Sequence, residues 1–123
     1  MRARRTINFG VIGCGLMGRE FASAAARWLH LVNLDFEPRI TAVCDAAAPA
    51  RQWFEQNIPT VSMSVEKHED LLGLKELEAV YIAVPHNLHA RIYTDAIAAG
   101  KHLLGEKPFG MDRAANAGIL RAA

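Results

Sequence analysis

Short apolar runs alternate with longer segments of helical periodicity along the chain. Because the runs are apolar on both faces, they predict strands buried within a sheet. One more strand, short and weak, is expected after Pro59. The four clear runs cover residues 6–12, 40–44, 79–84 and 102–105.

The intervals between these runs have the spacing of apolar residues that is typical of helices. Pro49 suits the first turn of one helix, and Gly100 suits the end of another. The predicted helices cover residues 17 to about 31, 49–57, 68–74, 88–99 and 112–123.

Strands that are each separated from the next by a helix need crossover connections, and therefore a parallel sheet covered on both faces. We predict a single α/β domain with a doubly wound parallel sheet, the Rossmann arrangement. Glu37, Pro38 and Arg39 predict a turn, and the long approach from Arg27 predicts an extended first helix or a loop insertion. In such sheets ligands bind beyond the carboxyl ends of the strands.

Composition and charge argue against a nucleic-acid partner. The chain has 123 residues, is 51% hydrophobic and carries a net charge of +1, so it has no basic field for nucleic acid. Its two cysteines, Cys14 and Cys44, are too few for a disulfide framework and favour a reducing, cytoplasmic location.

The N-terminus superficially resembles a secretory signal, with Arg2, Arg4 and Arg5 before an apolar run. That run is only about seven residues long and is interrupted by Asn8, which favours a first strand instead. No segment has the roughly 18 apolar residues that a membrane span requires.

The residues from Gly13 to Gly18 match the G-x-G-x-x-G dinucleotide fingerprint, directly after a strand and before a helix. Gly13 permits the tight turn, Gly15 lets the main chain approach a pyrophosphate, and Gly18 lets the helix pack on the strand. Leu16 and Met17 begin that helix, whose free N–H groups favour phosphate binding. The alternative is a glycine-rich turn without a ligand.

Asp45 follows the second strand, 27 residues after Gly18, where the usual separation is about 20. A carboxylate here would accept hydrogen bonds from the adenosine ribose and repel a 2′-phosphate, which favours NAD. Arg51 keeps NADP open, because a guanidinium could reach a 2′-phosphate. Alternatively, Asp45 caps the following helix.

Polar side chains follow the most apolar strand at Pro85, His86, Asn87 and His89, where they would suit contacts with a nicotinamide ribose. The His-x-x-His spacing also resembles half of a metal site, but no third ligand has matching spacing, so we predict no metal. In the alternative interpretation Asn87 caps a helix and His89 faces solvent or packs.

Glu106 and Lys107 follow the fifth strand, close to where a nicotinamide ring would end. The ammonium group could stabilise the alkoxide that develops as hydride leaves a substrate carbon. Glu106 could hold that lysine or touch the cofactor, and Pro108 is a candidate for a cis peptide bond.

The chain resembles the glucose–fructose oxidoreductase, inositol dehydrogenase and rhizopine-catabolism family of nicotinamide-dependent oxidoreductases. The resemblance runs from about Ile7 to the C-terminus and rests on residues 11–18, 42–45, 84–90 and 99–110. The family usually has Asn directly after the proline of the fourth-strand motif, whereas here His86 takes that place.

The resemblance implies a role for each motif. The three glycines would hold the pyrophosphate and Asp45 the adenosine ribose. Residues 86–89 would lie near the nicotinamide ribose, and Glu106 and Lys107 at the junction of cofactor and substrate. NAD is the implied cofactor, with NADP as the second choice.

Family members have a second α/β domain that forms the substrate wall and carries the Asp and His assigned to proton transfer. Only residues 109–123 follow Pro108 here. We therefore expect residues 1–123 to be a dinucleotide-binding domain, truncated within or after the helix that follows the fifth strand. We expect it to bind nucleotide without full turnover, to hold that last helix least firmly, and to self-associate through the face left open.

The resemblance further implies a parent enzyme that transfers hydride from a secondary hydroxyl of a sugar, cyclitol or related polyol to nicotinamide. Two alternatives stay open. Some relatives use bound NAD in a redox-neutral cycle that cleaves glycosidic bonds. The chain could also be a dinucleotide-binding sensor or partner subunit without catalysis.

Overall fold

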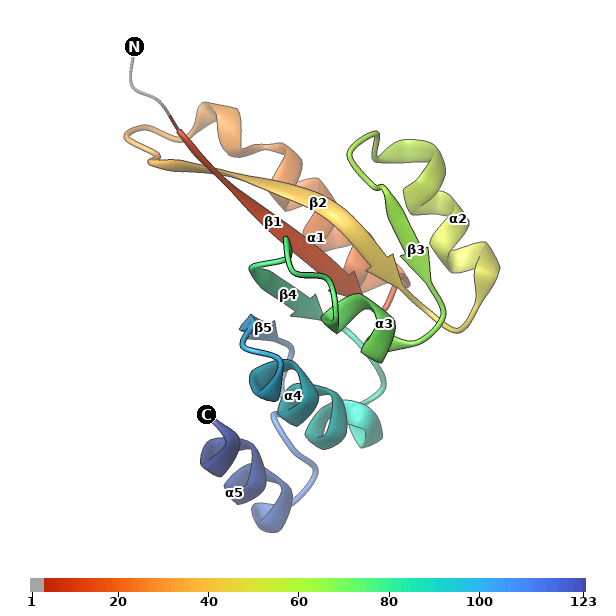
Figure 1. Ribbon diagram of the computed structural model, residues 1–123, viewed down its shortest axis with the longest axis vertical. Helices are drawn as coiled ribbons and strands as arrows, with labels where there is room; N and C mark the ends of the chain where they lie inside the picture. The colour runs from red at the N-terminus through yellow and green to blue at the C-terminus, as the bar shows by residue number, and fades with distance from the viewer. Residues whose placement is uncertain (1–3) are drawn as a thin grey trace.

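The computed structural model describes residues 4–123, which form a five-stranded sheet in the order β3-β2-β1-β4-β5 (Figure 1). Every neighbouring pair of strands is parallel, so the predicted doubly wound sheet is confirmed. From β1 the strands are added outward on one side as β2 and β3, and then on the other side as β4 and β5. The switch point of the sheet therefore lies between β1 and β4. The strands are β1 (Arg5–Ile12), β2 (Phe36–Cys44), β3 (Met63–Val65), β4 (Ala79–Ile82) and β5 (His102–Gly105).

The helices lie close to the predicted intervals, and local chemistry explains several of their ends. Pro49 occupies the first turn of its helix, and Gly100 follows another with a φ of 77°. Asp112 caps the last helix by accepting a hydrogen bond from the Ala115 N–H at 2.8 Å. The helices are α1 (Leu16–Ala26), α2 (Ala48–Asn57), α3 (His68–Leu72), α4 (His89–Ala98) and α5 (Arg113–Ala122), with 3₁₀ turns at Trp28–His30 and His86–Leu88.

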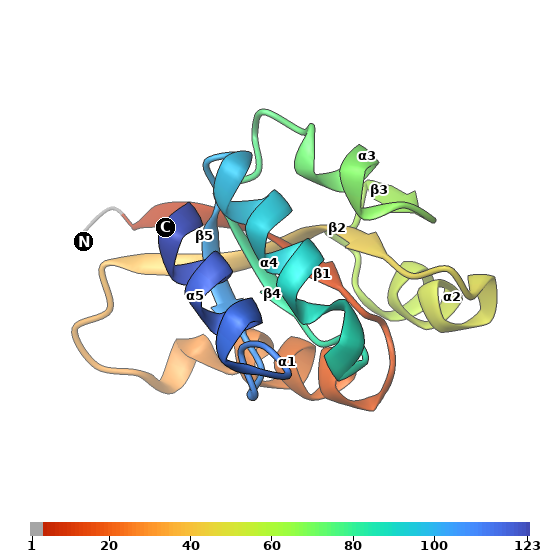
Figure 2. The ribbon, with the colours of Figure 1, turned by 90° about the horizontal axis from the view of Figure 1, so that it is seen from below.

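Helices cover both faces of the sheet (Figure 2). On one face, Ala22 of α1 and Phe54 of α2 pack on the sheet, while on the other Ile92 of α4 and Ile119 of α5 do so. Alternate strand residues serve the two faces: Val11, Val43 and Tyr81 point to α1 and α2, and Ile12, Cys44, Val80 and Ile82 to α3, α4 and α5.

Two predictions about the segment between β1 and β2 are wrong. Residues 37–39 form no turn, because they lie inside β2, where Pro38 pairs with Ile7. A proline is tolerated there because β3 pairs only with Ala42–Cys44, so the outer edge of β2 has no strand partner at Pro38. The first helix is also not extended to Leu31, since α1 ends at Ala26.

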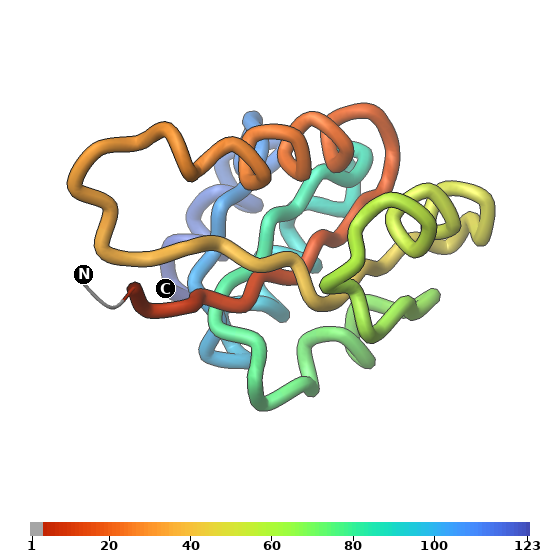
Figure 3. Tube along the Cα trace, turned by 90° about the horizontal axis from the view of Figure 1, so that it is seen from above, coloured from red at the N-terminus to blue at the C-terminus, as the bar shows by residue number. Residues whose placement is uncertain are grey.

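The loop-insertion alternative is confirmed instead. After α1 the chain makes the 3₁₀ turn and an irregular stretch that includes Asn33, with a φ of 63°. Figure 3 shows this orange segment projecting beyond the end of α1 before the chain returns along β2.

The apolar run near the N-terminus forms β1, which is flanked by β2 and β4 at the centre of the sheet. Of the predicted signal-like arginines, Arg2 lies outside the described residues. Within residues 4–123, no helix has the length and apolar character needed to cross a bilayer.

Candidate functional site

The carboxyl edge of the sheet brings together the segments that follow β1, β2, β3 and β4 around one cleft of about 450 Å³. Three predicted residues line it, namely Gly13, Asp45 and Pro85. The sequence patterns did not single out the rest of the wall, which is formed by Glu66, Lys67, His68, Glu69, Leu88 and Ile92 along with strand-end residues. The cleft lies at the switch point, where α/β sheets of this kind bind ligands.

Two glycines of the loop lie too close to main-chain oxygens to be replaced by a larger residue. Gly13 has a φ of 101°, and a Cβ atom there would lie 2.2 Å from the carbonyl oxygen of Ala83. A Cβ atom on Gly18 would lie 2.2 Å from the carbonyl oxygen of Gly13. Gly15 differs, because a Cβ atom there would meet no atom within 4 Å. Leu16 and Met17 begin α1 with exposed side chains.

The Asp45 carboxylate joins two loops. One oxygen accepts a hydrogen bond from the Cys14 N–H at 2.9 Å, and the other accepts from the Ala47 N–H at 2.8 Å. Ala47 is the N-cap residue of α2 and no side chain caps that helix, so Asp45 is not its N-cap. Its carboxylate instead fixes the glycine loop against the end of β2.

The cysteines under this site are buried free thiols. Burial, followed by the charge of Asp45, raises the pKa of both Cys14 and Cys44 to about 12. Both side chains lie in the hydrophobic core, where a thiol packs as a small apolar group.

The polar residues that follow β4 lie in two different environments, one exposed and one buried. His86 and Asn87 are exposed in a 3₁₀ turn, and no side chain caps α4, so the alternative in which Asn87 caps that helix is not supported. His89 is fully buried, and its Nε2 lies 3.0 Å from the carbonyl oxygen of Val84. Its ring therefore faces protein atoms rather than the cleft.

The two charged residues that follow β5 do not contact each other. The Glu106 carboxylate accepts a hydrogen bond from the Tyr81 hydroxyl, whereas Lys107 is exposed and has no hydrogen bond or ion pair with any residue from 4 to 123. Burial and the Glu106 carboxylate together raise the pKa of Tyr81. Glu106 thus does not hold Lys107. The expected cis bond is present between Lys107 and Pro108.

Arg51, which kept NADP open, is engaged with β3. Its Nη1 lies 3.3 Å from the Ser64 hydroxyl oxygen, and its Nε is buried without a partner among the described residues. Part of the guanidinium is therefore committed to the sheet.

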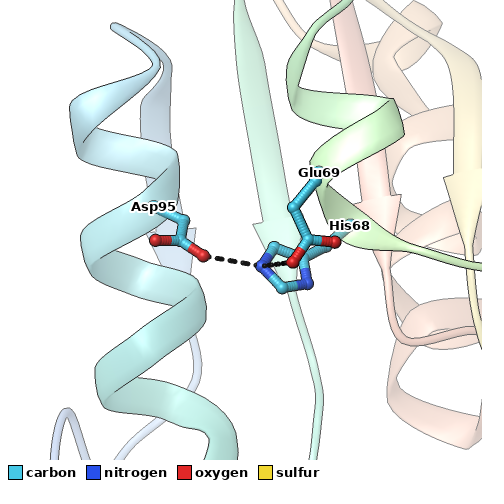
Figure 4. Close-up of side chains that lie close together, drawn as sticks. All are labelled: His68, Glu69 and Asp95. Atoms are coloured by element: carbon cyan, nitrogen blue, oxygen red, sulfur yellow. Dashed lines mark hydrogen bonds and ion pairs between the residues drawn. The ribbon is translucent and has the colours of Figure 1, made fainter.

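Beside the cleft, His68 and Glu69 of α3 meet Asp95 of α4 (Figure 4). The His68 Nε2 lies 2.8 Å from an Asp95 carboxylate oxygen and 3.4 Å from a Glu69 oxygen. These are ligand types that a metal ion could use, but the Arg91 guanidinium lies 3.6 Å from Glu69 and 3.9 Å from Asp95. Because Arg91 supplies positive charge to both carboxylates, we interpret the cluster as an ionic link between α3 and α4.

A second cavity, of about 370 Å³, lies between α1, β2 and the loop before β3. Its charged residues Glu37 and Arg39 face each other at 3.3 Å and so neutralise one another. It lies at the amino end of β2, away from the carboxyl edge where such sheets bind ligands, so we place the functional site in the first cleft.

Comparison with known proteins agrees with this geometry. Residues 7–123 match the oxidoreductase family with an NAD-binding Rossmann fold, and the chain belongs to that family. It is 36% identical over 111 residues to a dTDP-3,4-didehydro-2,6-dideoxy-alpha-D-glucose 3-reductase from Actinomadura kijaniata, a match that covers 87% of this chain and 30% of the relative.

Two further relatives extend the comparison. Inositol 2-dehydrogenase from Salmonella typhimurium is 26% identical over 109 residues, covering 89% of this chain and 31% of the enzyme. The structure of scyllo-inositol dehydrogenase from Lactobacillus casei with bound NAD(H) and scyllo-inositol shares the fold, with a TM-score of 0.82 at 24% identity over 96% of this chain and 33% of that one. The chain thus spans about a third of the length of these relatives.

Proposed function

We propose that this chain binds a nicotinamide dinucleotide across the carboxyl edge of its sheet, with NAD preferred to NADP. The parent protein would use that site to transfer hydride between the nicotinamide and a secondary hydroxyl of a sugar, cyclitol or related polyol. The observation that carries the proposal is the link between Asp45 and the glycine loop, because it joins the two parts that a dinucleotide must contact together.

The glycine loop fits a pyrophosphate. The space beside Gly15 is open, and the loop leads directly into α1, whose first N–H groups and positive dipole end suit an anion. The side chains of Leu16 and Met17 are exposed at the same helix start and would border the phosphates.

The cleft wall fits an adenosine. Leu88 and Ile92 give it apolar surface, and Asp45 stands where a ribose would follow the pyrophosphate. Each carboxylate oxygen can accept more than one hydrogen bond, so Asp45 can bind ribose hydroxyls while it keeps its two main-chain partners. Because Arg91 offsets the charge of Glu69, the comparison rests on Asp45 and Glu66, whose two negative charges outnumber that of the single lysine of the wall, Lys67. This balance disfavours a 2′-phosphate and supports NAD.

At the other end of the dinucleotide, the segment after β5 would meet the nicotinamide and the substrate. The nicotinamide supplies hydride acceptance when bound. Lys107, whose ammonium is free among the described residues, would donate a hydrogen bond to the substrate oxygen and stabilise negative charge there. His86 and Asn87 are exposed at the neighbouring strand end and would border the nicotinamide ribose.

Titration of the 123-residue chain with NADH, followed by nicotinamide fluorescence, tests the proposal. We expect a saturable increase in emission that ADP-ribose competes away, because both ligands would occupy the same cleft. No saturable change up to roughly millimolar NADH, a concentration that binding of only about 4 kcal/mol would half-saturate, would count against the site.

A further inference from the structure

The main chain on both sides of Lys107 is held by side chains of α4. The Tyr93 hydroxyl donates a hydrogen bond to the carbonyl oxygen of Glu106 at 2.5 Å. The His89 Nδ1 lies 2.5 Å from the carbonyl oxygen of Pro108. Lys107 lies between these two anchored carbonyl groups, so its main chain is fixed while its ammonium stays free.

Burial makes these contacts strong constraints. His89 and Tyr93 both have an exposed fraction of 0%, and His89 is the sole buried polar or charged residue of the part of the chain that the structure describes. A buried polar group without a partner costs about 1–3 kcal/mol, so a histidine here is stable only with acceptors for its ring. Val84 and Pro108 each offer a carbonyl acceptor, one from the end of β4 and one from the segment after β5. A neutral imidazole has a single N–H, so the anchor to Pro108 requires the tautomer with its proton on Nδ1.

Aromatic packing holds the side chains of His89 and Tyr93 in place relative to each other. The rings of His89 and Tyr93 stack with centroids 4.8 Å apart and an interplanar angle of 17°. The Phe109 ring meets the edge of Tyr93 at 5.3 Å. Gly105 leaves room for this arrangement, because a Cβ atom there would lie 2.5 Å from the Tyr93 ring.

We propose that His89 and Tyr93 are positioning residues that set Lys107 at the nicotinamide end of the site, by anchoring the carbonyl groups of Pro108 and Glu106. They act through the main chain and do not touch the nucleotide. This inference rests on the proposed function. It assigns His89 a role different from direct contact with the nicotinamide ribose, because its ring nitrogens already face Val84 and Pro108.

Loss of the anchors should affect the nicotinamide half and the ADP-ribose half of the dinucleotide differently. If the anchors serve only the nicotinamide end, their loss weakens NADH and leaves ADP-ribose, which lacks nicotinamide, unaffected. A merely structural role would weaken both ligands alike, since the cleft is part of the same domain.

Calorimetric titration of the whole chain with NADH and with ADP-ribose measures this difference. Tyr93→Phe removes one hydroxyl and keeps the ring, and His89→Gln replaces the two separate ring nitrogens by a single amide nitrogen. Thr94→Val is the matched control, because it removes a hydroxyl of α4 whose one hydrogen bond within residues 4–123 goes to the Ala90 carbonyl of the same helix. We expect Tyr93→Phe and His89→Gln to weaken NADH about tenfold, because residues 106–108, which would border the nicotinamide as well as the substrate, then lose roughly one anchoring hydrogen bond. ADP-ribose binding and the control should stay within about twofold of wild type.

Equal weakening of NADH and ADP-ribose, or no weakening of NADH, would overturn the inference. A wild-type chain that binds neither ligand would instead refute the proposed function, and the inference with it. If the variants do not fold, a measurement on the wild type alone still tests the inference. Long-range ¹H–¹⁵N correlation should show a proton on the His89 Nδ1, and a ring protonated on Nε2 alone would contradict the anchor to Pro108.

Discussion

The Cys14 N–H donates a hydrogen bond to the Asp45 carboxylate at 2.9 Å, which joins the loop after β1 to the end of β2 at the carboxyl edge of the sheet. The second carboxylate oxygen accepts from Ala47, so the acid is oriented by two main-chain groups. Such orientation lowers the conformational cost of binding a ligand that spans both loops. The same bond makes Asp45 matter for folding as well as for binding, and the tests below separate the two.

Exchanging glycines of the loop separates binding from folding. Gly15→Ala places a methyl group in open space, so we expect an unchanged unfolding temperature but at least about tenfold weaker NADH binding, because the methyl group would occupy the approach of the pyrophosphate. Gly18→Ala places its methyl group 2.2 Å from a main-chain oxygen, so we expect a loss of stability of about 1–3 kcal/mol. Thermal melts and NADH titration of both variants check this. A Gly15→Ala variant that binds like wild type would contradict the pyrophosphate placement.

Alkaline conditions should destabilise the fold through the buried thiols. The folded-state pKa of Cys14 and Cys44 is raised to about 12, above the ordinary value of 9.0, so the folded state holds protons that the unfolded state releases between pH 9 and 12. The stabilising effect is therefore complete below about pH 9 and is lost as the pH rises toward 12. Each thiol contributes a slope of about 1.4 kcal/mol per pH unit inside that window.

Urea unfolding at several pH values from 8 to 10 measures this slope. Cys44→Ala should lower the free energy of unfolding at pH 8 but flatten its decline with pH, because one titrating group is removed. Titration of the native protein with a thiol reagent at pH 8 should label neither cysteine until the protein unfolds. Rapid native labelling, or an unchanged slope in the variant, would disagree with the burial of these thiols.

Divalent metal ions should leave the protein unchanged. Arg91 already supplies positive charge to Glu69 and Asp95, and the His68 Nε2 lies 2.8 Å from Asp95, so a metal would have to displace both side chains. We expect neither Zn²⁺ nor chelator to change the unfolding temperature or NADH affinity by more than the experimental error. The matched control is His68→Ala, which removes the only imidazole of the cluster. Saturable, stoichiometric heat of Zn²⁺ binding that is lost in this variant would show that the cluster is a metal site.

Much of the fold follows from local sequence patterns. The apolar runs and the residues Pro49 and Gly100 predicted the strands and most helix ends, because burial and main-chain chemistry act there over short distances. Residues 37–39 were misjudged as a turn because tertiary pairing with β1 overrides the local preference of a proline. A short strand after Pro59 was predicted, but the sequence could not show that it pairs only with Ala42–Cys44 and leaves the edge at Pro38 uncovered.

The site was only partly predictable for a similar reason. The glycine loop and Asp45 are recognisable from spacing, since each motif lies within a few residues of a strand end. The partners of Glu106 and Pro108 are Tyr81, Tyr93 and His89, which lie on β4 and α4. The two tyrosines belong to no motif, and His89 was predicted to contact a nicotinamide ribose rather than these carbonyl groups. Their roles depend on the packing of α4 against β5, which a pattern of residues does not report.

The most direct test of the account compares NADH and NADPH binding to the wild type and to Asp45→Asn, with Asp70→Asn as an exposed control on α3. Asn keeps one carbonyl oxygen for the main-chain bonds but loses the negative charge. We expect the wild type to prefer NADH, Asp45→Asn to weaken NADH about tenfold while NADPH is weakened less, and the control to change neither. Equal losses for the two nucleotides, or an unchanged NADH affinity, would contradict the placement of the adenosine ribose at Asp45.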